Sequence, residues 1–385
     1  MDKQILKPVL KPSGEDVFLL GTMFLLIFLN LIYSLFPIRP IVYRVLIMLL
    51  CGFIVLIRKR IYTLPEKIIV VFLVVNFVYF VFALINRNLS TSTIGNAMIA
   101  MFPVLVFSYF AGKGCFTEKC INALFVILLL GSIVYYFDYQ LRFMERVSRE
   151  ENLTINASSV FLFLIPLLFY VKNKCISWGG IAICMFFVIS AVKRGNLVAS
   201  VGPLLLFGYY QIKKGKSIRN RLFILLISLV GFYFLYRLAI SSSYFLARLE
   251  DSLEGNLSGR ETIYGNAYQI WAGSSFSQFF FGHGFDATLK LMRIHAHSDW
   301  LEILVDYGFM GAALYLALFV SLGFQLKHCR TLEDKCVLLS VLYIWIVKSI
   351  ISMAYFEPWM ILLMISLGIA MSHSNKNLFV LQSRP

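Results

Sequence analysis

Long apolar runs follow one another along almost the whole of this 385-residue chain. A helix needs about 20 mainly apolar residues to cross the hydrocarbon core of a bilayer, and backbone polar groups in lipid must be paired within the segment. We therefore predict an all-α, polytopic integral membrane protein with about twelve transmembrane helices. Their expected ranges are 17–36, 41–57, 68–85, 93–112, 121–137, 157–171, 178–192, 196–212, 222–240, 300–325, 336–354 and 356–372.

The composition excludes other classes of protein. Hydrophobic residues make up 59% of the chain and charged residues 14%, which is incompatible with a soluble globular domain or a disordered chain. The formal net charge of +15 alone would suggest a nucleic-acid-binding protein. Most basic residues, however, lie in short loops between the apolar runs, which is the pattern that sets membrane topology. We expect the lipid bilayer as a partner, and no nucleic acid.

The distribution of basic residues also predicts the orientation. With the N-terminus inside, 21 of the 35 Lys and Arg residues fall in inside loops and 11 in outside loops. Inside loops carry the positive excess in membrane proteins, so both termini are predicted to be cytoplasmic. The expected organisation is helices one to nine in 1–240, an outside loop at 241–299, helices ten to twelve in 300–372 and a cytoplasmic tail at 373–385. Short surface helices are expected within the loop at 243–253 and 260–272.

A polar stretch that contains histidines leads directly into the tenth apolar run. His297, Leu301, Leu304, Gly308 and Gly311 have the spacing of one face of an α-helix. This spacing predicts His297 at the outer mouth of the helix, above two glycines where another helix can approach closely. A histidine with a near-neutral pKa at that position is suited to take a proton from a hydroxyl group.

The neighbours of His297 do not have metal-ligand spacing. His295 is only two residues away, whereas two zinc ligands on one helix use a spacing of four, so no metal is predicted. Asp299, Glu302 and Asp306 follow another face of the same predicted helix. They either orient a base or a basic partner, or they are solvated or paired charges. The Gly-His-Gly sequence around His283 predicts a tight turn, with His283 as a turn residue.

Two basic positions stand out on the predicted outside. Lys193 and Arg194 lie between two apolar runs, against the positive-inside trend. Charge held there marks a substrate path, or else it anchors the helix ends at the interface. Arg260 follows Ser258 and Gly259 in the large outside loop. Its planar guanidinium matches phosphate oxygens, although a solvated surface arginine would look the same in sequence.

The order of these motifs resembles that of the bacterial O-antigen ligase and polymerase superfamily. The resemblance covers roughly residues 191–315: a Lys-Arg-Gly turn, Ser-Gly-Arg, Gly-x-Gly, and His-Ser-x-x-Leu-Glu followed by Gly-x-x-Gly. Arg194 matches the arginine of the family's turn, Arg260 the loop arginine, and His297 the family histidine. Two positions differ from the commonest forms of the family: Lys193 stands where serine is frequent, and Ser298 where asparagine is frequent.

The resemblance implies a metal-independent glycosyltransferase without a cofactor, at the periplasmic face of the bacterial inner membrane. The donor would be a glycan on undecaprenyl diphosphate. His297 would be the catalytic base, Arg194 and Arg260 would bind the diphosphate, and the supporting positions would be Lys193, His295, Asp299 and Glu302. Direct attack by an acceptor hydroxyl would invert the anomeric centre.

Three functions are compatible with this pattern. The favoured one is a polymerase of O-antigen or capsule repeat units, whose acceptor is another lipid-linked unit and whose further candidate partner is a chain-length regulator. The alternative is an O-antigen ligase that transfers the glycan to lipid A–core. A transporter or flippase of lipid-linked oligosaccharides is a third reading. It predicts midplane charges and two half-repeats, whereas the strongest polar cluster lies in one outside loop.

Overall fold

The regular secondary structure of the described part of the chain is all helical. This computed structural model describes residues 12–36, 38–85, 91–146, 156–191, 193–215 and 260–374, together with Tyr233 and Arg237. Within these residues no strand is present. The helices are α1 (Gly14–Leu31), η1 (Tyr33–Leu35), α2 (Pro40–Ile57), α3 (Leu64–Ile85), α4 (Thr91–Met101), α5 (Pro103–Gly112), α6 (Glu118–Arg146), η2 (Asn156–Ser158), α7 (Ser159–Leu164), η3 (Ile165–Phe169), α8 (Lys174–Ser190), α9 (Arg194–Lys214), α12 (Arg260–Ala272), α13 (Phe276–Phe281), α14 (Ala287–Met292), α15 (Asp299–Gln325), η4 (Leu326–His328), α16 (Leu332–Ile351) and α17 (Met360–Ser374).

The predicted apolar runs coincide with helices wherever the chain is described. Six helical segments there are long and apolar enough to cross a membrane, and three further apolar helices are shorter. Apart from Tyr233 and Arg237, the predicted run 222–240 lies outside the described residues, as does the predicted helix 243–253. Two prolines interrupt helices, because proline lacks a backbone N–H donor: α4 ends just before Pro103, and α7 becomes the 3-10 helix η3 around Pro166. Pro203, in contrast, lies inside α9, which continues past it.

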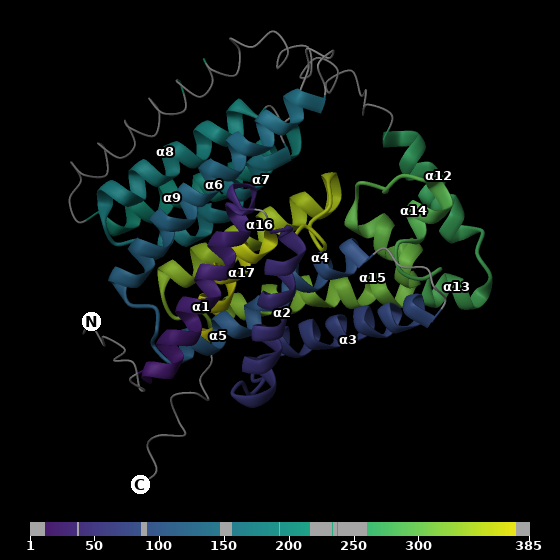
Figure 1. Cartoon of the computed structure of the whole chain (residues 1–385), viewed down its shortest axis with the longest axis horizontal. Coiled ribbons are helices and arrows are strands. Elements are labelled where there is room, and N and C mark those ends of the chain that lie inside the picture. The colour runs from purple at the N-terminus through teal and green to yellow at the C-terminus, as the bar shows by residue number, and fades with distance from the viewer. Residues whose placement is uncertain are drawn as a thin grey trace.

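Helix α17 forms the centre of the bundle (Figure 1). Its side chains from Met360 to Met371 are almost all buried, and it packs along α5. A Cβ atom on Gly368 would lie 2.6 Å from Cβ of Phe107, so only a glycine permits this close approach of the two helices. Helices α1, α2 and α3 instead expose large apolar side chains, as surfaces that face lipid do.

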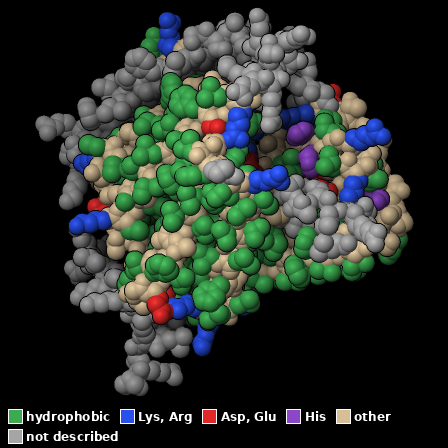
Figure 2. All heavy atoms as spheres, in the orientation of Figure 1, with side chains coloured by type: hydrophobic (Ala, Val, Ile, Leu, Met, Phe, Trp, Pro, Cys, Tyr) green, Lys and Arg blue, Asp and Glu red, His purple; other side chains and the backbone are tan. Residues whose placement is uncertain are grey.

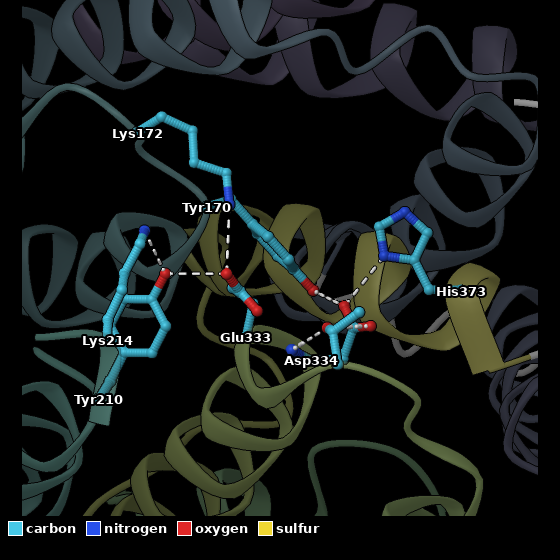
Figure 3. A network of polar contacts seen from close by, with 8 residues as sticks. Tyr170, Lys172, Tyr210, Lys214, Glu333, Asp334 and His373 are labelled. Atoms are coloured by element: carbon cyan, nitrogen blue, oxygen red, sulfur yellow. Dashed lines mark hydrogen bonds and ion pairs between the residues drawn. The ribbon is translucent and has the colours of Figure 1, made fainter. Parts of the chain in front are cut away.

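The N-terminal end of α16 is tied to its neighbours by a polar network (Figure 3). The buried Asp334 carboxylate accepts a hydrogen bond from the Tyr170 hydroxyl at 2.7 Å and lies 2.9 Å from Nδ1 of His373 on α17. Glu333 accepts from the Tyr210 hydroxyl of α9 at 3.0 Å and from Nζ of Lys172 at 3.2 Å. This network fixes the N-terminal end of α16. The helix has 20 residues, so its C-terminal end lies about 30 Å away.

Helices α12 to α14 and the turns around them, residues 260–297, stand beyond one end of the bundle (Figure 1), and we call this region the cap. The structure confirms the predicted helix at 260–272 as α12. The cap packs on α15, and the Tyr79 hydroxyl of α3 donates a hydrogen bond to the carbonyl of Phe281. One end of the bundle therefore carries a folded, largely helical cover.

The cap is joined to α15 at a break in that helix. Gly308 has φ +67°, so the predicted continuous helical face through Gly308 and Gly311 is wrong. The break frees the carbonyls of Val305 and Asp306, and these accept hydrogen bonds from the backbone N–H groups of His283 (2.8 Å) and Gly284 (3.0 Å). The Gly-His-Gly turn thus supplies the donors that the broken helix lacks. His283 is a turn residue, as predicted, with Nε2 2.5 Å from Oγ of Ser274.

Two glycines of this turn allow a matched test. Gly282 and Gly284 both have positive φ, but a Cβ on Gly282 would overlap the carbonyl oxygen of Asp306, whereas a Cβ on Gly284 would meet open space. Gly284→Ala should cost only the left-handed strain, about 1–2 kcal/mol. Gly282→Ala should cost more and separate the cap from α15. Melting temperatures in detergent and protease cleavage of the cap would measure this; equal effects of the two changes would contradict the close-packing argument.

Candidate active site

His297 lies just before α15 rather than on it. Ser298 is the N-cap residue with extended backbone, Asp299 is the first helical residue, and His297 itself has φ +55°. The prediction that His297 shares a helical face with Leu301 and Leu304 is therefore wrong. The left-handed residue turns the chain from the cap into the helix, which holds the imidazole at the junction of the two.

The surroundings of His297 favour its neutral form. The side chain of His297 is half-buried. The backbone carbonyl oxygen of His297 accepts a hydrogen bond of 3.5 Å from the Tyr264 hydroxyl. Burial lowers the pKa of His297 below its usual 6.5, and the nearby positive charges of Arg260 and His295 lower it further. Since the imidazole accepts a proton only when neutral, this environment keeps His297 available as a base at neutral and mildly acidic pH.

His295 is paired with a buried carboxylate. Its Nδ1 lies 3.3 Å from Oε1 of Glu302, and this contact is the main reason that the pKa of His295 is raised. Glu302 is buried, and its carboxylate also accepts hydrogen bonds from the backbone N–H of Ala296 (2.6 Å) and from the Thr288 hydroxyl. Glu302 therefore organises the turn that carries both histidines. The described residues contain no group of three or more His, Cys, Asp or Glu side chains placed to hold a metal.

The other two carboxylates of this stretch are also buried and paired. Asp299 accepts backbone hydrogen bonds from Ala354 (2.7 Å) and Tyr355 (3.2 Å) and a third from the Tyr315 hydroxyl (2.6 Å). Asp306 accepts from the backbone N–H groups of Asp286 (3.1 Å) and Ala287 (2.8 Å). Of the two interpretations left open by the sequence, solvated charges are excluded. Asp299 fastens α15 to the α16–α17 turn, and Asp306 fastens it to the cap.

Arg260 begins α12 and reaches across to the bundle. Its Nη1 donates a hydrogen bond of 2.5 Å to the carbonyl of Ile351, the last residue of α16. A helix C-terminus carries partial negative charge and free carbonyl groups, so a guanidinium is a favourable partner there. The contact uses one of five N–H groups of Arg260. Its charge lies near enough to His297 and Lys193 to lower the pKa of both.

Lys193 joins the same cluster from α9, whose N-cap it forms. Burial lowers its pKa to about 8, and the positive charges of Lys348 and Arg260 contribute. Lys193, Arg260 and His297 come from three separated parts of the chain and lie near enough for the charges of Lys193 and Arg260 to lower the pKa of His297. Basic and histidine side chains gather around a hollow between the bundle and the cap (Figure 2). Arg194 is the first residue of α9, but its side chain lies outside the described residues, and its role stays a prediction.

Sequence reasoning missed the buried polar residues beneath this cluster. Nζ of Lys348 lies 2.8 Å from Oε2 of Glu357, 3.2 Å from Oγ of Ser159 and 3.5 Å from Oδ1 of Asn196. Lys348 lies within the predicted apolar run 336–354, and the sequence analysis singled out neither Lys348 nor Glu357. The available signal was a lysine inside a predicted membrane helix, since such residues are usually paired and functional.

These features define a multi-pass helical membrane protein with a cationic, histidine-bearing site at one end of its bundle. Residues 179–316 match a family model described as O-antigen ligase. The match covers about a third of the chain, from α8 into α15, and it includes Lys193, Arg260 and His297. Over these residues the chain is therefore similar to the O-antigen ligase family. No curated protein matches the chain.

Proposed function

We propose that this protein is a glycosyltransferase of the periplasmic face of a bacterial inner membrane, with both termini in the cytoplasm. It joins oligosaccharide repeat units carried on undecaprenyl diphosphate into a surface polysaccharide. The observation that carries the proposal is that the segments bearing Lys193, Arg260 and His297 all contact the last turn of α16, residues 348–351. The family match over residues 179–316 supports the same class of reaction.

The proposed reaction is a single displacement. The acceptor hydroxyl gives its proton to His297 while its oxygen attacks the anomeric carbon of the donor sugar. The bond between that carbon and the diphosphate oxygen breaks, and its electron pair leaves on the diphosphate. Arg260, Lys193 and Arg194 stabilise the negative charge that develops there, which is the task that a metal ion performs in other phosphate chemistry. One displacement inverts the configuration of the sugar.

The second candidate is an O-antigen ligase, which the description of the matching family favours directly. Both enzymes use the same donor and the same chemistry, and they differ in the acceptor. A polymerase transfers the growing chain to another lipid-linked repeat unit, whereas a ligase transfers it to lipid A–core. The favoured proposal remains the polymerase.

Surface-glycan profiles on gels would separate the two candidates. In a polymerase, deletion of the gene should collapse the polysaccharide ladder to core plus one repeat unit. In a ligase, deletion should leave bare core while polymer stays on its lipid carrier. Complementation of the deletion strain with the wild-type gene should restore the ladder. Complementation with the His328→Ala variant should do the same, because His328 is an exposed histidine in η4, remote from the site in sequence. An unchanged ladder in the deletion strain would contradict both functions.

A further inference from the structure

The last turn of α16, residues 348–351, contacts all three parts of the site. We propose that Lys348 is a positioning residue of the transfer site, which together with Glu357 fixes this turn as the platform that sets α9, Arg260 and the His297 segment relative to one another. This inference rests on the proposed function. It concerns residues outside the region that matches the family model, 179–316.

Lys348 is too deeply buried to touch a substrate itself. Its side chain is 0% exposed, and its ammonium faces Glu357, Ser159 and Asn196, with the Phe163 ring centroid 5.5 Å away. Taking a lysine out of water is costly, and only good geometry with a carboxylate and further hydrogen bonds offsets that cost. The hydrogen-bond partners come from α7 and α9, so the charge holds three helices together at one point.

The first link leads to α9. Asn196 lies in the first turn of that helix, two residues after Arg194, and is itself fully buried. Its amide Nδ2 donates to Oγ of Ser158 at 2.7 Å, while its Oδ1 faces Lys348. The orientation of the first turn of α9 is therefore set by the ammonium of Lys348. This turn carries Lys193 at its N-cap.

The second and third links lead to the cap and to α15. Arg260 donates to the Ile351 carbonyl, one turn from Lys348. Oγ of Ser298 donates to the Ser349 carbonyl at 3.3 Å, and Nε1 of Trp300 donates to Oγ of Ser349 at 3.2 Å. Ser298 directly follows His297. The last turn of α16 therefore contacts both Arg260 in the cap and the backbone segment that carries His297. A shift of this turn would move Arg260 and His297 together.

Glu357 completes the arrangement from the α16–α17 turn. Its side chain is 18% exposed, and its backbone N–H donates to the Ala354 carbonyl at 3.0 Å. Asp299 holds the N–H groups of Ala354 and Tyr355 in the same turn. Asp299 thus links the α16–α17 turn to α15, and the Glu357–Lys348 ion pair links the same turn to α16.

The test uses the full-length protein in nanodiscs and a double variant, Lys348→Met with Glu357→Leu. Replacing both partners of a buried ion pair by apolar residues is often neutral for folding, so the melting temperature should stay near that of the wild type. Transfer activity should nevertheless fall by about 10²-fold, because misplacement of positioned groups by about 1 Å has that effect. The pKa of His297, followed by NMR, should rise as Arg260 loses its fixed place near the imidazole.

The matched control is Lys172→Met with Glu333→Leu, which removes an ion pair of the same residue types at the opposite end of α16. It should change neither the pKa of His297 nor the affinity for inorganic pyrophosphate, used as a probe of the diphosphate site. A well-folded Lys348/Glu357 double variant with wild-type activity, pyrophosphate affinity and His297 pKa would overturn the positioning role. Arg260→Gln tells the two hypotheses apart: if it also leaves pyrophosphate affinity unchanged, the proposed function itself fails.

Discussion

A His297→Gln variant should lose about 10² to 10⁴-fold in transfer rate, because that is the usual contribution of a positioned general base. The substitution keeps a polar side chain of similar size at a half-buried position, so the fold should persist. The rate would be measured on purified enzyme with lipid-linked repeat units, by separating the glycan products. His283→Gln is the matched control, since His283 lies in the turn before α14 and its ring faces Ser274.

The pH dependence of the wild-type rate gives an independent check. His297 acts as a base only when neutral, so the rate is full above its pKa and falls as the pH drops through that value. Burial and Arg260 lower this pKa below 6.5, and the acid limb of kcat/KM should therefore lie below 6.5. The limb should disappear in His297→Gln. An acid limb at or above 6.5, or a His297→Gln rate equal to that of the wild type, would contradict the assignment of His297 as the base.

The apolar runs predicted the described helices closely because burying apolar surface in lipid dominates their formation. The expected run 178–192 appears as α8 (Lys174–Ser190), and 300–325 appears as α15 (Asp299–Gln325). The sequence did not predict the extension of α6 to Arg146, beyond the expected end at 137. That part of the helix carries Asp138 and Arg142, which form an i,i+4 ion pair of 2.6 Å and support the helix outside the apolar run.

The break at Gly308 could not be predicted from spacing. A glycine with φ near +67° is stable there because His283 and Gly284 donate hydrogen bonds to the freed carbonyls, and these donors lie more than twenty residues away in the chain. Local periodicity contains no information about such a partner. The same reason explains the wrong placement of His297, since the first helical residue depends on how Ser298 and Asp299 are held by α16 and the α16–α17 turn.

The sequence singled out Lys193, Arg260 and His297 because charged groups at a membrane interface stand out in an apolar chain. Their roles in binding and catalysis stay predictions. The roles of Glu302 and Asp299 required the structure, because a carboxylate in sequence does not show whether backbone N–H groups surround it. Lys348 was missed because its hydrogen-bond partners on α7 and α9 are distant in sequence, and Glu357 because its role depends on Lys348.

Removing the guanidinium of Arg260 should weaken diphosphate binding. A hydrogen bond to a charged group contributes about 1.5–3 kcal/mol, so Arg260→Gln should lower the affinity for inorganic pyrophosphate by about 10- to 100-fold. The loss of the positive charge should also raise the pKa of His297, since Arg260 is the nearby charge that lowers it most. The acid limb of the rate should then move to higher pH. Calorimetry with pyrophosphate and the pH–rate profile would measure the two effects separately.

Arg260→Lys separates the charge of Arg260 from its shape. Lysine keeps the positive charge, so the pKa of His297 should stay low, but an ammonium cannot bind a phosphate in the bidentate way or reach Ile351 with the same fork. Pyrophosphate affinity should therefore fall with little movement of the acid limb. Arg293→Gln, which changes an exposed arginine elsewhere in the cap, should alter neither quantity. If Arg260→Gln and Arg293→Gln behave alike, Arg260 is a surface arginine and the diphosphate must be bound by other residues.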